Sequence, residues 1–109
     1  MSIYHIVAAA DWRAACAEGS YRPPSLAEQG FVHFSHSRQV AQVANERYRD
    51  QDGLIVVEFD PSRLPAPVVE EDVYDAGQEF PHVYAAIPTS AAVAEHPLRR
   101  DDAGDYRFP

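Results

Sequence analysis

The chain has 109 residues, 46% of them hydrophobic and 11% aromatic, which is typical of one globular domain. Its formal net charge of -8 argues against a protein that binds DNA or RNA through phosphate contacts. The sequence has no apolar run long enough to span a bilayer, no basic signal region near its start, and a single cysteine that cannot form an internal disulfide. We therefore expect a cytoplasmic protein with neither a nucleic acid nor a membrane as partner.

The first expected elements are a strand and a helix. Residues 3–8 are largely apolar and predict a strand. Asp11 is placed to cap a helix that runs to Glu18, and Gly19 is placed to end it. Helical spacing puts Cys16 on the apolar face of this helix, where we expect an inert buried thiol.

A helical turn, a strand and a longer helix follow. Residues 25–28 have the spacing of a capping box and predict one helical turn. Residues 31–34 predict a second strand, because aromatic and β-branched residues fit a pleated surface. Residues 36–49 predict the best helix of the chain, with Ser35 or Ser37 as its cap.

The second half of the chain is composed mainly of expected strands. Residues 54–59 give the clearest strand pattern, and residues 68–74 predict an edge strand whose exposed edge is blunted by carboxylates. Residues 80–87 and 91–95 predict two further strands. Residues 97–109 read as a charged, loose tail from which aromatic side chains can dock.

Helices early and strands late predict an α+β fold. We expect a mixed, mostly antiparallel sheet with two or three helices. A doubly wound α/β fold is excluded, because the alternation of strand and helix stops after Tyr48. The whole chain, residues 1–109, is expected to form a single domain.

Three of the expected strands carry one histidine each within an apolar segment: His5, His33 and His82. A histidine in such a surface costs free energy unless its ring nitrogens find partners, so three in a small chain indicate one polar site on a sheet. Side-chain alternation puts Ser35 on the face of His33, and Tyr84 on the face of His82. If the strands are neighbours, these groups can line one cleft suited to a ligand rich in hydroxyl and phosphate groups.

Other interpretations stay open from the residues alone. Each histidine can be structural, in a non-catalytic ligand-binding or interaction module. Histidines can also hold zinc in a small metal-dependent hydrolase, but no metal-ligand spacing is present, so no metal is expected. Glu70, Glu71 and Asp72 read as a solvated charge run. Glu79 precedes the strand of His82, where a loop can carry it into the cleft.

Several distinctive segments are spread over nearly the whole chain. They are Ile3-Tyr4-His5-Ile6, Trp12, Gly19-Ser20-Tyr21, Ser25-Leu26, Gly30-Phe31-Val32-His33-Phe34-Ser35, Gln39-Val40, Val43-Ala44-Asn45 and Phe80-Pro81-His82-Val83-Tyr84. In this order they resemble the bacterial domain-of-unknown-function 952 family, which is grouped by fold with the ADP-ribosyltransferase-like superfamily. The resemblance implies that fold and a site for NAD or a related nucleotide. It also leaves open a transferase of the ADP-ribosyltransferase type.

The resemblance also suggests roles for the polar residues. His5 resembles the first-strand residue that contacts a ribose, and Ser35 is expected to bind a phosphate or a ribose hydroxyl. We assign His33 and His82 as candidate catalytic residues, with Tyr84 beside the reacting end of the ligand. The glutamate that often completes such sites on a later strand is not clearly placed here. Glu79 is the expected substitute if a loop brings it in.

Overall fold

The computed structural model describes residues 1–109 and combines three α-helices with four small antiparallel sheets. The α-helices are α1 (Ala9–Glu18), α2 (Pro24–Gln29) and α3 (Val40–Arg47). The strands are β1 (Ile3–Ala8), β2 (Ser20–Tyr21), β3 (Val32–His33), β4 (Leu54–Phe59), β5 (Val68–Glu71), β6 (Phe80–Val83), β7 (Ile87–Pro88), β8 (Ala92–Pro97), β9 (Arg99–Arg100) and β10 (Tyr106–Arg107). The α+β class is confirmed, but every strand pairing is antiparallel, and two three-stranded sheets replace the expected single mixed sheet.

The first three-stranded sheet has the order β1-β4-β8, with β4 in the middle. The register of β1 on β4 runs from Ile3 opposite Phe59 to Ala8 opposite Leu54. Both strands have the bounds that their apolar runs predict. Residues alternate between the two faces of β1, so that His5 points to the same side as its neighbours two residues away.

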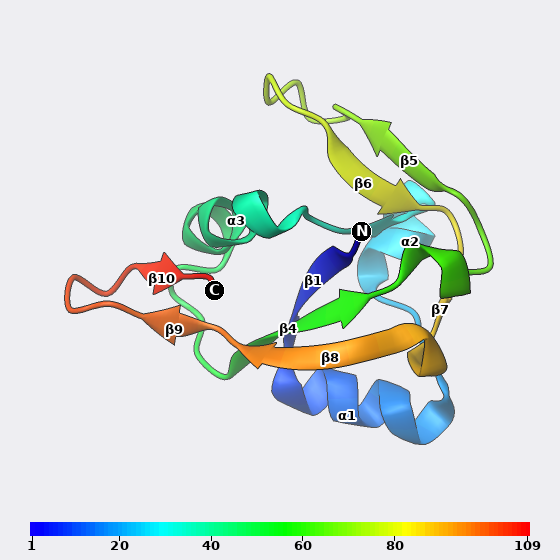
Figure 1. The fold of residues 1–109 in the computed structure, drawn as a ribbon, viewed down its shortest axis with the longest axis horizontal. Helices are drawn as coiled ribbons and strands as arrows, with labels where there is room; N and C mark the ends of the chain where they lie inside the picture. The colour runs from blue at the N-terminus through cyan, green and yellow to red at the C-terminus, as the bar shows by residue number, and fades with distance from the viewer.

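The second three-stranded sheet has the order β3-β6-β5 and places two of the histidines side by side. His33 on β3 lies directly opposite His82 on β6, and His82 lies opposite Val69 on β5. The expected strands at residues 31–34 and 80–87 are both shortened, and a bridge between Tyr4 and Ser35 joins this region to β1. In Figure 1 the β5–β6 pair stands at the top, on the side of the central sheet away from α1.

The helix caps differ from those that the sequence predicts. Helix α1 begins at Ala9 after an extended Ala8, so Asp11 lies inside the first turn and does not cap it. Helix α2 follows Pro23, and Ser25 donates its hydroxyl to the backbone oxygen of Phe31 at 2.9 Å instead of capping.

The expected helix at residues 36–49 is shorter and has a different cap. A 3-10 turn (η1, Ser37–Gln39) precedes α3, which begins at Val40. The side chain of Gln39 accepts a hydrogen bond from the backbone N–H of His36 at 2.9 Å, so His36 takes the capping position that was expected at Ser35 or Ser37. Gly19 does end α1, with the positive φ of 82° that glycine adopts at low cost.

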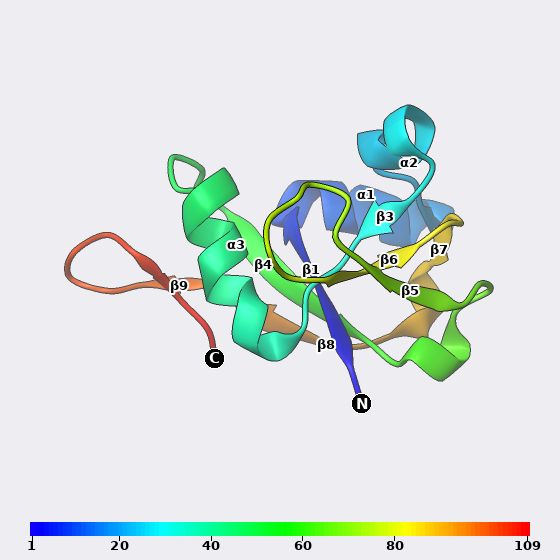
Figure 2. The same cartoon turned by 90° about the horizontal axis from the view of Figure 1, so that it is seen from above.

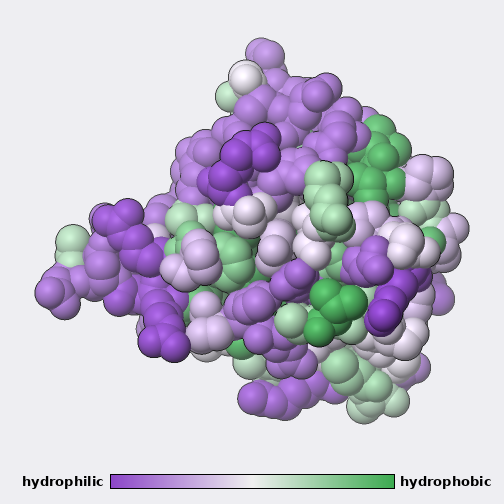
Figure 3. All heavy atoms as spheres, in the orientation of Figure 1, coloured by the Kyte–Doolittle hydropathy of each residue, from purple (hydrophilic) through white to green (hydrophobic).

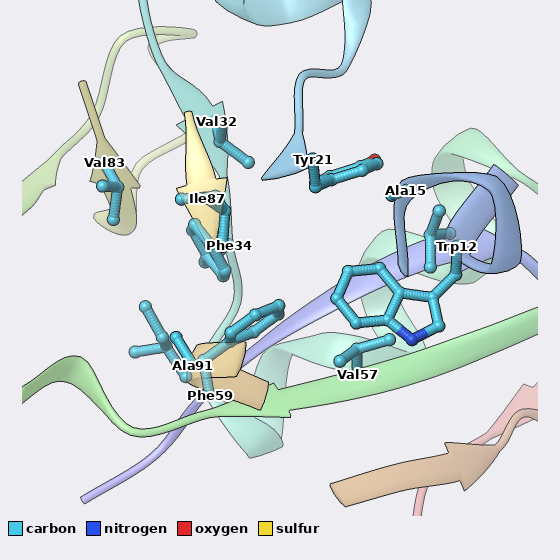
Figure 4. Packing of buried hydrophobic residues seen from close by; sticks show 12 residues of the cluster. Trp12, Ala15, Tyr21, Val32, Phe34, Val57, Phe59, Val83, Ile87 and Ala91 are labelled. Atoms are coloured by element: carbon cyan, nitrogen blue, oxygen red, sulfur yellow. The ribbon is translucent and has the colours of Figure 1, made fainter. Parts of the chain in front are cut away.

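The larger hydrophobic cluster lies between the two sheets and α1. Phe59 forms edge-to-face contacts with Trp12 and Phe34, with ring centroids 5.8 and 5.4 Å apart (Figure 4). Only Trp12 and Ala15 of α1 are buried, whereas Cys16 is exposed. The expectation of a buried thiol is wrong because this short helix turns one narrow stripe to the core, and Cys16 lies beyond it.

A second cluster lies under α3 and includes the end of the chain. Residues 99–107 form the β9–β10 hairpin, which projects beside α3 in both ribbon views (Figures 1 and 2). The side-chain amide of Asn45 donates to the backbone oxygen of Tyr106 at 3.1 Å, and the backbone N–H of Tyr106 donates back at 2.7 Å. Tyr106 is buried, so this hairpin is fixed to the body of the protein.

The surface is dominated by hydrophilic residues on the face shown in Figure 3, with hydrophobic side chains in small separate patches. None of the helices combines the length and the apolar character that crossing a membrane requires.

Candidate functional site

A cavity of about 310 Å³ opens between the end of β1, α2 and the end of α3. It is lined by His5, Ile6, Val7, Ala8, Asp11, Tyr21, Pro23, Pro24, Ser25, Gln29, His33, Arg47, Tyr48, Gln51, Leu54 and Tyr74. Its volume lies at the lower end of the range of about 300–1,000 Å³ for small-molecule sites. The walls combine aromatic rings with two imidazoles, one carboxylate and one guanidinium, so the cavity can bind a polar ligand on several sides.

The first imidazole of the cavity, His5, is held by two hydrogen bonds. Its Nδ1 lies 2.6 Å from the backbone oxygen of His33, and its Nε2 lies 2.7 Å from the hydroxyl of Tyr21. A carbonyl oxygen only accepts, so the proton of His5 sits on Nδ1, and Tyr21 donates to Nε2. Burial lowers the pKa of His5 to about 4, and it raises the pKa of Tyr21. Both groups are therefore neutral at neutral pH.

The other two histidines form a hydrogen-bonded chain with a carboxylate. Nδ1 of His33 lies 3.1 Å from Nε2 of His82, and Nδ1 of His82 lies 2.9 Å from Oε1 of Glu71. His82 is 0% exposed and stacks on the ring of Phe31 with centroids 4.0 Å apart. Tyr84 donates its hydroxyl to the same oxygen of Glu71. These two bonds, the one from Tyr84 first, lower the pKa of Glu71 and keep it ionised.

The sheet register explains this chain of contacts. His33 and His82 are a directly opposed cross-strand pair. Glu71 is two residues beyond Val69, the partner of His82, so it is a diagonal neighbour on the same face. The outer nitrogen of the chain, Nε2 of His33, is buried and has no hydrogen-bond partner. Burial and the nearby charge of Arg47 lower the pKa of His33 to about 3, so His33 is also neutral.

A cation and an aromatic ring form the outer wall of the cavity. The guanidinium of Arg47 lies 4.5 Å from the ring centroid of Tyr74, in the geometry of a cation–π contact. The hydroxyl of Tyr74 donates to the side chain of Gln29 on α2 at 3.2 Å, so this ring connects α2 with α3. Arg47 forms no ion pair with a carboxylate of the protein. Its positive charge is thus available to an anionic ligand.

The structure brings together some of the residues that the sequence singles out and separates others. His5 and His33 line the cavity, while His82 lies behind His33 and does not reach it. Ser35 is 2% exposed and beside a crevice of only about 10 Å³ with His5 and His33, not in the cavity. Tyr84 is 48% exposed on the outer side of Glu71.

The acidic residues are the main correction to the sequence analysis. Glu79 is exposed and outside the cavity, and only its backbone oxygen is engaged, by the side chain of Gln39 at 2.8 Å. Glu71, which the charge run marked as solvated surface, is the carboxylate that contacts His82. Period-two alternation on an edge strand could have raised this possibility, since it puts every second carboxylate on the same face of the sheet, where it can contact a side chain of the neighbouring strand.

Sequence reasoning also missed the cavity residues outside the histidine strands. Arg47 falls within the expected helix at residues 36–49, and Asp11 was expected only to cap a helix. Tyr74 ends the expected edge strand at residues 68–74, and Tyr21 stands only in a segment that carries the family resemblance. No local pattern identifies these four as neighbours, because they meet only through the tertiary fold.

The structure contains no group of three or more His, Cys, Asp or Glu side chains that could hold a metal ion.

Comparisons with known proteins agree with this fold and do not supply an activity. The model of a family described as "Protein of unknown function (DUF952)" matches residues 6–95. The crystal structure of protein CC0527 from Caulobacter crescentus is similar, with 28% identity, a TM-score of 0.85, and coverage of 98% of this chain and 94% of that one. The solution structure of CC0527 matches with a TM-score of 0.74 at 28% identity over 95% and 90% of the two chains. No curated protein matches the sequence.

Proposed function

Because the chain belongs to the DUF952 family of proteins of unknown function, its role has to be inferred from its own geometry, and we propose that its cavity binds NAD or a related nucleotide. The observation that carries this proposal is an unpaired guanidinium, Arg47, in the same cavity as a buried and unpartnered imidazole nitrogen, Nε2 of His33. The guanidinium suits a phosphate, because its planar fork of N–H donors matches phosphate oxygens. The imidazole nitrogen suits a hydroxyl group of a sugar.

The remaining walls fit the other parts of a nucleotide. The rings of Tyr48 and Tyr74 offer apolar faces to a flat base, and the carboxylate of Asp11 offers acceptors to hydroxyl groups. A cation–π contact already holds Arg47 on Tyr74. The side chain therefore loses less conformational entropy when a phosphate binds to it.

A neighbouring cavity gives room for a second nucleotide half. It has a volume of about 360 Å³ and shares Asp11, Tyr21, Pro23 and Pro24 with the first. In this proposal the first cavity holds a mononucleotide, and a dinucleotide extends past Tyr21 into the second. A transferase of the ADP-ribosyltransferase type often uses a carboxylate in its site. Here the carboxylate that lines both cavities is that of Asp11, whereas Glu79 is outside them.

Calorimetric titration with NAD, ADP-ribose, AMP and adenosine tests this proposal. We expect the three phosphate-bearing ligands to bind more tightly than adenosine. Arg47→Gln should weaken their binding by about tenfold to a hundredfold, since a charge-assisted hydrogen bond is lost. Arg49→Gln is the matched control, because Arg49 follows the same helix but pairs with Asp105 outside the cavity. Equal affinities of the wild type and Arg47→Gln, or no binding at millimolar ligand, would refute the proposal.

The same reagents test the transferase reading separately. Release of nicotinamide from NAD can be followed by chromatography over hours in the presence of the wild type and of Asp11→Asn. Release that stops in the variant would support catalysis in this cavity. Binding of NAD without release of nicotinamide would identify a non-catalytic binding module.

A further inference from the structure

We propose that Glu71 and His82 hold His33 in the tautomer whose Nε2 is an unprotonated hydrogen-bond acceptor, so that the cavity selects ligands that donate a hydroxyl at this point. The choice of a nucleotide as the ligand rests on the proposed function. The tautomer is a property of the protein alone and can be tested without any ligand.

The direction of the hydrogen bonds follows from the carboxylate at the inner end. An ionised carboxylate is acceptor-only, so Nδ1 of His82, 2.9 Å from Glu71, must carry a proton. In neutral His82 the other nitrogen, Nε2, is then an acceptor. It lies 3.1 Å from Nδ1 of His33, which must donate. Neutral His33 with a proton on Nδ1 has a lone pair on Nε2.

The opposite arrangement would require a doubly protonated His82. In that case His82 would donate from both nitrogens, and His33 would present an N–H group to the cavity. His82 is 0% exposed and stacked on Phe31, and a charge in such a place has a large desolvation cost. Only one carboxylate, that of Glu71, contacts the His82 ring, and Tyr84 already shares its Oε1. The arrangement in which His82 donates only to Glu71 avoids this desolvation cost.

The hydroxyl of Tyr21, beside His5, is a second hydrogen-bond acceptor in the cavity. Tyr21 donates its only proton to Nε2 of His5, so the phenol oxygen keeps lone pairs for a further donor. Nε2 of His33 and the oxygen of Tyr21 then give the cavity two acceptors, the exposed carboxylate of Asp11 adds a third, and the donating guanidinium of Arg47 lies on the outer wall. A ligand that fits this arrangement has hydroxyl groups at one end and an anionic group at the other.

A buried acceptor without a partner also makes the cavity selective between ligands with and without a hydroxyl at this point. A hydroxyl that reaches Nε2 of His33 satisfies a group that is otherwise unpaired, whereas a ligand without that hydroxyl leaves it unpaired. We therefore expect a ribonucleotide to bind at least about tenfold more tightly than the corresponding deoxynucleotide that lacks the contacting hydroxyl.

Nitrogen NMR of the imidazoles tests the tautomer directly. In a two-bond ¹H–¹⁵N correlation spectrum of ¹⁵N-labelled protein at pH 7, we expect His33 to show a protonated Nδ1 and an unprotonated Nε2. His82 should show the same pattern. A protonated Nε2 on His33, or a doubly protonated His82, would overturn the inference.

Two neighbouring carboxylates provide a matched pair of variants. Glu71→Gln replaces the charge that fixes the proton of His82, so the two nitrogen shifts of His33 should move toward each other as its tautomers mix. Glu70→Gln is the control on the same strand, because Glu70 contacts His36 and not His82. His33 shifts that stay unchanged in Glu71→Gln would show that Glu71 does not position the proton.

Binding of AMP, 2'-deoxy-AMP and 3'-deoxy-AMP tests the selectivity. At least one deoxy ligand should bind about tenfold less tightly than AMP to the wild type, and His33→Phe should remove that difference. If AMP binds and neither deoxy ligand is weaker, the selectivity inference fails while the proposed function stands. If no nucleotide binds, the proposed function fails together with hydroxyl selection, and the NMR result still decides the tautomer.

Discussion

Acid should destabilise this protein well before its carboxylates titrate, because the buried His5 and the half-buried His33 at the cavity are both neutral. The pKa of His5 is lowered from 6.5 to about 4, and that of His33 to about 3. The unfolded chain therefore binds more protons between pH 6.5 and pH 4, and stability falls as the pH falls through this window. From pH 7 to pH 5 each histidine should remove about 2 kcal/mol from the free energy of unfolding, or about 4 kcal/mol together.

Urea unfolding at pH 7, 6 and 5, followed by the fluorescence of the buried Trp12, measures this loss. Comparison with His33→Gln isolates one histidine, because groups that titrate elsewhere contribute equally to both proteins. The variant should lose about 2 kcal/mol less than the wild type between pH 7 and pH 5. His96→Gln, at a partly exposed histidine paired with Glu58, should not reduce the loss. Equal losses in the wild type and His33→Gln would refute the reasoning.

Three further predictions concern the body of the protein. Phe59→Ala should lower the free energy of unfolding by about 3–5 kcal/mol in a urea titration, since Phe59 is wholly buried against Trp12 and Phe34. Asn45→Ala should cost about 1–3 kcal/mol and increase amide exchange in the β9–β10 hairpin, because both hydrogen bonds to Tyr106 are lost. Exhaustive chelation should leave the melting temperature unchanged, and a large drop that zinc restores would contradict the expected absence of a structural metal.

The parts of the fold that were predictable from sequence are those in which one local signal dominates. β1 and β4 are uninterrupted apolar runs, and both have the predicted bounds. Helix starts were less predictable, because Asp11 and Ser25 have capping side chains that the structure uses elsewhere or leaves free. The backbone of Ala8, already extended at the end of β1, starts α1 without a side-chain cap.

Of the candidate site, only the histidines on the apolar strands were predictable from the sequence. His5 and His33 line the cavity, as expected of polar groups on apolar strands. The contact between His33 and His82 depends on the register of β3 on β6, which no local pattern specifies. Glu71 and Arg47 were missed for a similar reason: one belongs to a charge run and the other to a helix end, and both environments are usually solvated.

The pairing of Ile3 with Phe59 also has a consequence for how the chain reaches its native state. Strands that meet across more than fifty residues close a large loop before any contact stabilises them, and such topologies fold slowly. We expect folding in milliseconds to seconds rather than microseconds. His33 likewise meets His82 only after a long loop closes, so the cavity forms late. A partly folded chain therefore lacks the assembled cavity, and a ligand of the proposed site would stabilise only molecules that have finished folding.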